Sequence, residues 1–253
     1  MRVGRTNRFG VVEALGGLAA GFILASVAVS LVASASHRTS NPSHFASDVT
    51  SLLGLWAGLL GAVILASWLA DRAPKGLFAR LRDDYGFTLR PWPDIPLGIA
   101  AGLGAQYLLE PLLTLPLAPF VPDLSTRLGA PARRLTAGVG PGGLVALGLL
   151  VCVGTPLVEE LFFRGLFLRG LAGRLARIPP LSGRLLAPLS VLVTSVLFGL
   201  VHFEALQLLG LVGFGVVVGT LAWRTGRLGP GIVAHLSFNA ATFVSLAALR
   251  PRL

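Results

Sequence analysis

The chain has 253 residues, of which 54% are hydrophobic and only 13% charged, and its mean hydropathy is +0.78. Soluble domains carry about 25% charged residues, so this composition excludes an ordinary soluble protein and predicts a single membrane-embedded domain over 1–253. A net charge of +10 would suggest nucleic-acid binding in a soluble protein. Here the arginines lie between apolar runs, where they orient the chain and meet anionic lipid, so we expect a lipid bilayer and no nucleic acid as partner.

Seven apolar segments follow one another along the chain, each near the ~20 residues that cross a bilayer as a helix. They are 10–33, 51–70, 95–118, 142–163, 185–203, 206–223 and 229–249. The first ends in Ala33-Ser34-Ala35, which resembles a signal-peptidase site, but its apolar core is longer than that of a signal peptide. We therefore expect a spanning helix there. The predicted fold class is all-α: a polytopic transmembrane helix bundle of seven spans, or of eight.

The basic residues predict how the bundle is oriented. With the N-terminus inside, most of the 21 basic residues fall on the cytoplasmic side, as the positive-inside rule favours. The cytoplasmic set includes Arg2, Arg5, Arg8, Arg72, Lys75 and the arginines from Arg164 to Arg184, and the outer set includes Arg38, Arg127, Arg250 and Arg252. The preference for arginine over lysine is typical of GC-rich bacterial genomes. We expect a bacterial protein integral to the cytoplasmic (inner) membrane, with its N-terminus and its active site facing the cytoplasm.

Two adjacent carboxylates, Glu159 and Glu160, stand inside an apolar stretch in which Arg164 is the only other charge. An ionised group at such depth costs about 2.5–3.5 kcal/mol on insertion scales and usually marks a function and a partner. Glu160 and Arg164 are one helical turn apart, so this carboxylate has a structural counter-charge. Glu159 points about 100° away around the helix. It is therefore available as a general base.

Two further pairs at a spacing of four place polar groups on hydrophobic helices. Phe198 and His202 end the fifth segment, and His235 and Asn239 lie inside the seventh. Hydrolysis is the chemistry that fits this set. Glu159 can deprotonate a water that His202 orients, while His235 and Asn239 can donate hydrogen bonds to the oxyanion that develops on an amide carbonyl.

A metal-dependent version of this chemistry stays open. Glu159, His202 and His235 could hold a divalent ion such as zinc, whose bound water would be the nucleophile. The chain has no His-Glu-x-x-His motif, so the metal has no independent support in the sequence. A serine mechanism is disfavoured because no Gly-x-Ser-x-Gly elbow surrounds Ser195. The single cysteine, Cys152, lies in an apolar run, where we expect it to pack.

Taken together and in this order, the three patterns resemble the CPBP family of CAAX-type prenyl endopeptidases and bacteriocin-processing enzymes, also called the Abi family. The patterns are Glu159-Glu160-x-x-x-Arg164, Phe198-x-x-x-His202 and His235-x-x-x-Asn239. The resemblance covers roughly 142–245, which would be the catalytic core. It leaves 1–141 as N-terminal helices without an assigned role.

The resemblance implies an intramembrane endopeptidase of a class often named metalloprotease. Its substrate would be a membrane-associated peptide or protein, either a lipidated CAAX-type C-terminus or a leader or bacteriocin peptide. Carried over by position, Glu159 would be the water-activating base and His202 its partner. His235 and Asn239 would form the oxyanion side. The structural support would come from Glu160, Arg164 and Phe198.

Two rival classes of function remain, together with one geometric question. A proton-coupled transporter or channel would use Glu159, the histidines and Glu110, which precedes the helix-interrupting Pro111, as a relay. Inverted repeats, which a transporter should show, are not visible in the sequence. A non-catalytic membrane scaffold is the other alternative. If the fifth segment spans from Arg184, His202 would lie about 27 Å along its helix, near the opposite face from Glu159, unless that segment is tilted, broken or differently bounded.

Overall fold

The predicted apolar segments all coincide with helices in the computed structural model, which describes residues 10–36, 44–70 and 76–248. Within these ranges every regular element is a helix and no strand occurs, so the all-α prediction is confirmed. The elements that correspond to the seven segments are α1 (Val11–Ser36), α2 (His44–Ala70), α4 to α5 (Pro91–Gly104, Glu110–Thr114), α8 to α10 (Pro141–Leu149, Thr155–Glu160, Leu168–Leu175), α11 (Leu186–Leu200), α12 (Leu208–Thr225) and α13 (Gly229–Ala248). Short helices fill the connections: α3 (Leu77–Asp83), η2 (Leu115–Leu117), α6 (Leu124–Leu128), α7 (Ala130–Thr136) and η5 (Pro179–Leu181).

Judged by length and composition, fewer helices are candidate membrane spans than the sequence predicted. Four helical stretches of the described chain are long and apolar enough to cross a membrane: Val11–Ala35, His44–Leu69, Pro141–Leu175 and Leu208–Thr225. Helix α11 is apolar but shorter. The third segment is divided by a π-helical turn, η1 (Ala105–Leu109), that precedes Pro111. The structure therefore supports a helical membrane protein, and the count of seven or eight spans is not confirmed.

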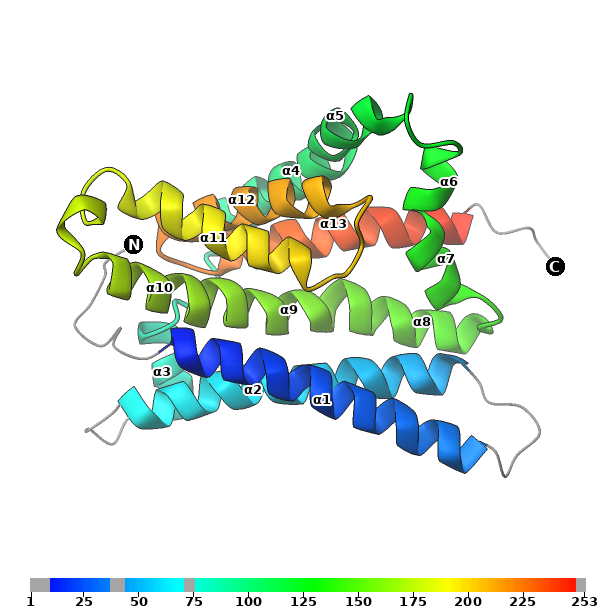
Figure 1. Ribbon diagram of the computed structural model, residues 1–253, viewed down its shortest axis with the longest axis horizontal. Coiled ribbons are helices and arrows are strands. Elements are labelled where there is room, and N and C mark those ends of the chain that lie inside the picture. Colours follow the sequence, from blue (N-terminus) through cyan, green and yellow to red (C-terminus); the bar gives the residue numbers. More distant parts are fainter. Residues whose placement is uncertain (1–9, 37–43, 71–75, 249–253) are drawn as a thin grey trace.

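The helices lie on two sides of one long composite helix, α8 to α10 (Figure 1). The antiparallel hairpin of α1 and α2 lies on one side, and α11, α12 and α13 lie on the other. Within the hairpin the two backbones approach closely, since a Cβ atom on Gly58 would stand 2.2 Å from the backbone nitrogen of Gly21. Small residues permit such close helix packing in membranes.

The composite helix extends well beyond the predicted segment 142–163. It continues to Leu175, so Arg164, which the sequence analysis placed with the cytoplasmic arginines, is in fact 1% exposed inside the bundle. That placement was wrong because the buried partners described below compensate the arginine and let the helix continue. Glu159 consequently lies near the middle of the composite helix, about 27 Å from its start and about 24 Å from its end at 1.5 Å per residue.

Two π-helical turns interrupt the composite helix on either side of α9. They are η3 (Leu150–Gly154) and η4 (Leu161–Phe167). Pro156 follows η3 and explains it, because proline has no N–H to donate and its ring clashes with the carbonyl four residues earlier. A π turn removes this clash by widening the helix, and such turns are frequent at functional sites.

The position of His202 is explained by where helix α11 ends, and not by a break within that helix. Helix α11 is a single helix of 15 residues, about 22 Å long. Pro188 lies in its first turn, where proline does not break a helix. The helix ends at Leu200 beside the middle of the composite helix, and the chain then turns back into α12 (Figure 1). The fifth segment therefore ends before the far face, and His202 lies in the turn that follows it.

Glycines along α12 pack closely against neighbouring helices, as the sequence indicated. A Cβ on Gly213 would stand 2.6 Å from Leu113 Cδ1, and one on Gly215 would stand 2.9 Å from Ser195 Cβ. Cys152 is buried and free, as expected for a packing residue. The predicted orientation rests partly on residues outside the described ranges, namely Arg2, Arg5, Arg8, Arg38, Arg72, Lys75, Arg250 and Arg252.

Asp94 joins the start of α4 to the connection between α12 and α13, a contact the sequence did not reveal. Its carboxylate is fully buried and accepts hydrogen bonds from Arg227, with Nη2 to Oδ1 at 2.5 Å and Nε to Oδ2 at 3.2 Å. The backbone N–H of Arg90 also donates to Oδ2, at 2.8 Å. This two-pronged pairing is the strong form of an arginine–carboxylate contact, and it fixes where α13 begins.

Candidate active site

Glu160 accepts two contacts on the same oxygen atom. Its Oε1 lies 2.9 Å from Arg164 Nη1, on the next turn of the same helix, and 3.0 Å from His235 Nδ1, which comes from α13. Glu160 is 0% exposed and His235 is 3% exposed. A buried carboxylate requires such compensation. The predicted pairing of Glu160 with Arg164 is therefore present, and His235 joins it.

Arg164 is held by more than its carboxylate partner. Its Nη2 donates to the backbone carbonyl of Gly215 in α12 at 3.3 Å, and its Cζ lies 4.5 Å from the centre of the Phe198 ring in α11. A guanidinium over an aromatic face is an attractive cation–π contact, which strengthens when it is removed from water. Phe198 thus supports the site by covering the arginine.

Glu159 faces the other nitrogen of the same histidine. Its Oε2 lies 3.9 Å from His235 Nε2, and this oxygen is buried without a hydrogen-bond partner. If His235 Nδ1 donates to Glu160, its Nε2 is left as an acceptor toward Glu159. His235 therefore lies between the two carboxylates, with one ring nitrogen toward each. Including Arg164, the set keeps one uncompensated negative charge while His235 is neutral.

The hydrogen bond and the ring contact of His202 are with Phe198 and not with Glu159. Its Nδ1 is 2.6 Å from the carbonyl oxygen of Phe198, and its ring centre is 4.7 Å from the Phe198 ring. Among the described residues no hydrogen bond or ion pair joins His202 to Glu159. Phe198 packs against both histidines, since the centre of its ring is also 5.9 Å from the His235 ring. The two histidines thus share one aromatic wall.

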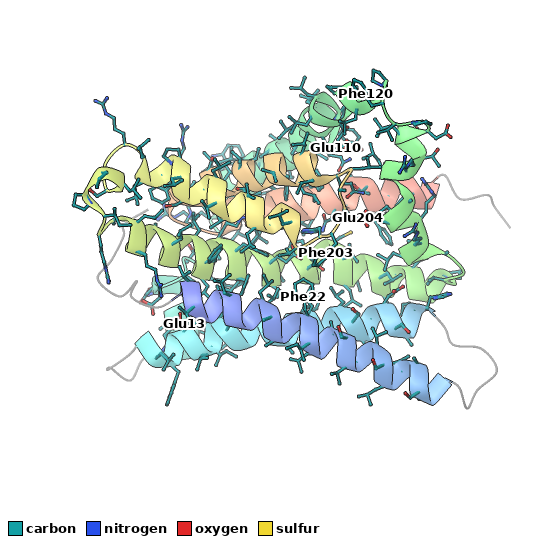
Figure 2. All side chains as sticks on the ribbon, in the orientation of Figure 1. Glu13, Phe22, Glu110, Phe120, Phe203 and Glu204 are labelled. Carbon is teal, nitrogen blue, oxygen red and sulfur yellow. The ribbon has the colours of Figure 1, made fainter. Side chains whose placement is uncertain are left out.

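The turn that carries His202 is strained and is contacted by the N-terminal hairpin. Phe203 has a φ of 55°, a left-handed conformation that is uncommon for a bulky residue. Its ring packs edge-on against Phe22 of α1, with ring centres 5.4 Å apart, and Figure 2 labels both side chains. Helix α1, which had no assigned role from the sequence, therefore supports the turn next to His202.

Asn239 lies one helical turn beyond His235 and binds backbone. Its Nδ2 donates to the carbonyl oxygen of Val151, in the π turn η3, at 2.9 Å. The second hydrogen of the amide group remains for another acceptor. Asn239 is thus tied to the helix that carries the two glutamates, two turns before them.

The residues suggested as metal ligands are not gathered into a ligand set. Across the described ranges, no group of three or more His, Cys, Asp or Glu side chains lies close enough together to hold a metal ion. Glu159 and His235 are adjacent, but His202 does not complete a group of three with them. A three-residue zinc site of the usual kind does not fit this arrangement.

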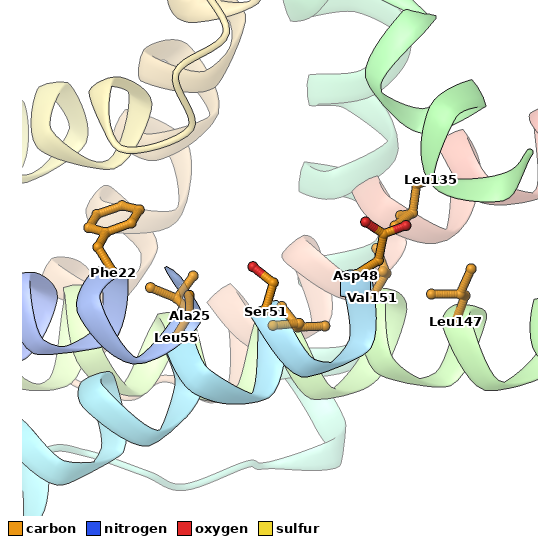
Figure 3. A pocket seen from close by; sticks show the side chains of 9 residues that line it. Phe22, Ala25, Asp48, Ser51, Leu55, Leu135, Leu147 and Val151 are labelled. Atoms are coloured by element: carbon orange, nitrogen blue, oxygen red, sulfur yellow. The ribbon is translucent and has the colours of Figure 1, made fainter. Parts of the chain in front are cut away.

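A cavity of about 260 Å³ borders the same helix on the side of the N-terminal hairpin (Figure 3). Its walls are mostly apolar, and its polar groups are Asp48 and Ser51 of α2. Phe22 and Val151 also line it. Val151 precedes Glu159 by about 12 Å along the helix. The cavity therefore lies beside the π turn that Asn239 contacts.

These features define a class of protein: a helical membrane protein with a buried Glu-Glu-Arg-His cluster on two packed helices, the composite helix and α13. Residues 141–241 match the family described as Rce1-like, type II CAAX prenyl endopeptidase Rce1-like. The predicted resemblance to the CPBP family is confirmed. No curated protein and no solved structure matched the chain. The family match indicates a CAAX-type intramembrane endopeptidase.

The residues of the cluster were predicted from the sequence, but not all of their contacts were. His202 was predicted as the partner of Glu159, whereas His235 is the histidine next to Glu159. It also missed the carbonyl of Gly215 and the use of Phe198 as a cover for Arg164. The spacing of four between Phe198 and His202 was the one available signal for the aromatic wall.

Proposed function

We propose that the protein is an intramembrane endopeptidase in which Glu159 activates water to hydrolyse a peptide bond. The observation that supports this most directly is the position of His235 between the two glutamates, within the segment that matches the endopeptidase family. Two acceptors 3.9 Å apart, Glu159 Oε2 and His235 Nε2, can each take a hydrogen from one water molecule. Buried oxygens without a partner, such as Glu159 Oε2, call for a donor of this kind.

In the proposed reaction, Glu159 takes a proton from the water as its oxygen attacks the carbonyl carbon of the peptide bond. The tetrahedral intermediate then breaks its C–N bond, and the proton passes from Glu159 to the leaving nitrogen. Glu160 and Arg164 hold His235 in the orientation that presents Nε2. This geometry favours His235 as the partner of the base, a role that was predicted for His202.

The carbonyl oxygen of the substrate would be stabilised from the opposite side. We assign this task to His202, in the turn after α11. No step passes through a metal, because the proposed ligands do not form a set. We also propose that all seven helical segments lie in the cytoplasmic membrane, with the site reached from the cytoplasm. The substrate would be a membrane-associated peptide, prenylated or of the leader type.

The test compares membranes that carry the wild-type chain with membranes that carry Glu159→Gln. Peptide-terminus proteomics should show cleavage products that disappear in Glu159→Gln and His235→Ala, because each removes an acceptor for the water. Glu110→Gln is the matched control: Glu110 is another glutamate on an apolar helix and packs against Gly210 of α12, away from the cluster. Undiminished cleavage in Glu159→Gln would overturn the proposal.

The same variants separate the protease from a proton-coupled transporter. A relay would need Glu110 as well as Glu159, so proton uptake lost in both variants, with no cleavage by the wild type, would favour the transporter. A scaffold would show neither activity. Addition of a chelator addresses the metal, and we expect cleavage to persist because Glu159, His202 and His235 are not assembled as ligands.

A further inference from the structure

The carbonyl oxygen of Val151 has lost its partner within its own helix. In an α-helix it would accept from the N–H of residue 155, and in a π turn from that of residue 156. The Thr155 N–H is bonded instead to the carbonyl of Leu150, five residues earlier. Residue 156 is proline, which has no N–H. Neither helical geometry therefore supplies a donor to Val151.

The missing donor comes from a helix that is distant in sequence. Asn239 of α13 donates from Nδ2 to the Val151 carbonyl oxygen at 2.9 Å, across a separation of 88 residues. A backbone carbonyl left unpaired at this depth is costly, because lipid offers no donor. The asparagine and the proline thus form a complementary pair: one residue removes a hydrogen bond and the other replaces it.

We propose that Asn239 is a positioning residue that holds the helix break in front of Glu159 by replacing the hydrogen bond that Pro156 cannot make. A π turn acts as a one-residue insertion, so it rotates everything that follows by about 100° around the helix. Glu159 and Glu160 follow Pro156 within four residues, and they face His235 only in the rotated register. Loss of the Asn239 contact releases the break and misaligns the carboxylates.

A purely direct role for Asn239 leads to a different expectation. As an oxyanion donor alone, Asn239 would be needed whatever stands at position 156. As a positioning residue, it becomes dispensable once the helix regains its own donor. Pro156→Ala restores that N–H, so the Val151 carbonyl can be satisfied without the asparagine. The two roles are separated by whether the effect of Asn239→Ala depends on Pro156.

The experiment is a double-mutant cycle on the full chain in detergent micelles and in membranes. The proteins are wild type, Asn239→Ala, Pro156→Ala and the double variant, each measured by thermal unfolding midpoint and by peptide cleavage. We expect Asn239→Ala to lower the midpoint by several degrees and cleavage at least tenfold. In the Pro156→Ala background the same substitution should change the midpoint by less than half as much.

Additive effects in the midpoint, with equal loss from Asn239→Ala in both backgrounds, would overturn the proposal. Ser245→Ala is the control on the same helix, since Ser245 is exposed and bonds only to the carbonyl of Ala241, and its effect should be independent of Pro156. The cleavage measurement rests on the proposed function, whereas the midpoint does not. Coupled midpoints without cleavage by any protein would reject the protease and leave the positioning role standing. If Pro156→Ala alone abolishes cleavage, the proposal is tested by the unfolding midpoints: coupled midpoints support the positioning role, and additive midpoints overturn it.

Discussion

Arg164 combines three contacts that no other side chain could make together. One nitrogen binds the Glu160 carboxylate, another donates to the Gly215 carbonyl, and the planar group covers the Phe198 ring. A guanidinium has five donors in a fixed plane, whereas an ammonium is a compact point charge. The position therefore requires the shape of arginine as well as its charge.

Arg164→Lys should accordingly destabilise the protein although the charge is kept. We expect a loss of about 1.5–3 kcal/mol, the value of one hydrogen bond to a charged group, together with reduced cleavage, because Glu160 would hold His235 less firmly. Thermal unfolding in detergent and the cleavage assay would measure both. Arg174→Lys, at an exposed position of α10, is the control. Equal behaviour of the two variants would contradict the argument.

The contacts of the cluster also show what a sequence can predict at this scale. Glu160 and Arg164 are one turn apart, so their pairing follows from helix geometry alone. The contact of His235 with Glu160 spans 75 residues, and it depends on how α13 packs against the composite helix. Spacing within one helix carries no information about such packing. The prediction therefore named His202 as the partner of Glu159, and spacing could not show that His235 lies closer.

At the scale of helices, hydropathy was enough to locate every apolar segment. It was not enough to predict where each helix ends or where its geometry becomes irregular. The C-terminal end of the fourth segment was misplaced because buried partners let Arg164 stay within the helix. The fifth segment proved too short to reach the far face, since α11 stops after 15 residues. Proline gave a local signal for the irregular turns, before Pro111 and before Pro156.

The hairpin of α1 and α2 offers a test of helix packing by matched glycines. Gly58→Leu would place side-chain atoms where the backbone of Gly21 lies, because even a Cβ would stand 2.2 Å from its nitrogen. Gly61→Leu, one turn along the same helix, meets nothing within 4 Å. We expect Gly58→Leu to cost at least about 1–3 kcal/mol, as overpacking does, and Gly61→Leu to be neutral. Unfolding in detergent measures this, and similar stability of both variants would argue against the hairpin contact.

The same hairpin connects packing to the site, since Phe22 of α1 contacts Phe203 next to His202. Separation of α1 from the rest should therefore reduce cleavage in Gly58→Leu in addition to lowering stability. Phe120 is about as exposed as Phe203 but lies at the upper edge of the fold in Figure 2, whereas Phe203 and Phe22 lie near its centre. The N-terminal helices thus have a structural reason to accompany the Rce1-like segment.

At the scale of the whole molecule, the distribution of the arginines predicts which end of the bundle faces the cytoplasm. Figure 1 places the connection between α10 and α11 at one end and α6 at the other. Arg177 lies exposed in the first region and Arg127 lies exposed in the second. The positive-inside rule favours the first end in the cytoplasm, since it collects more of the basic residues. Orientation then determines from which side a substrate reaches Glu159.

Cysteine labelling tests this orientation because the chain has a single native cysteine, Cys152, which is buried. In a Cys152→Ser background, a membrane-impermeant maleimide added to intact cells should label Arg127→Cys at once. Arg177→Cys should react only after the membrane is opened. The reverse pattern would invert the bundle and make an outer substrate necessary. Labelling of both positions from the same side would mean that the long α8 to α10 helix does not cross the membrane, which would remove the physical reason for pairing the Glu160 carboxylate with both Arg164 and His235.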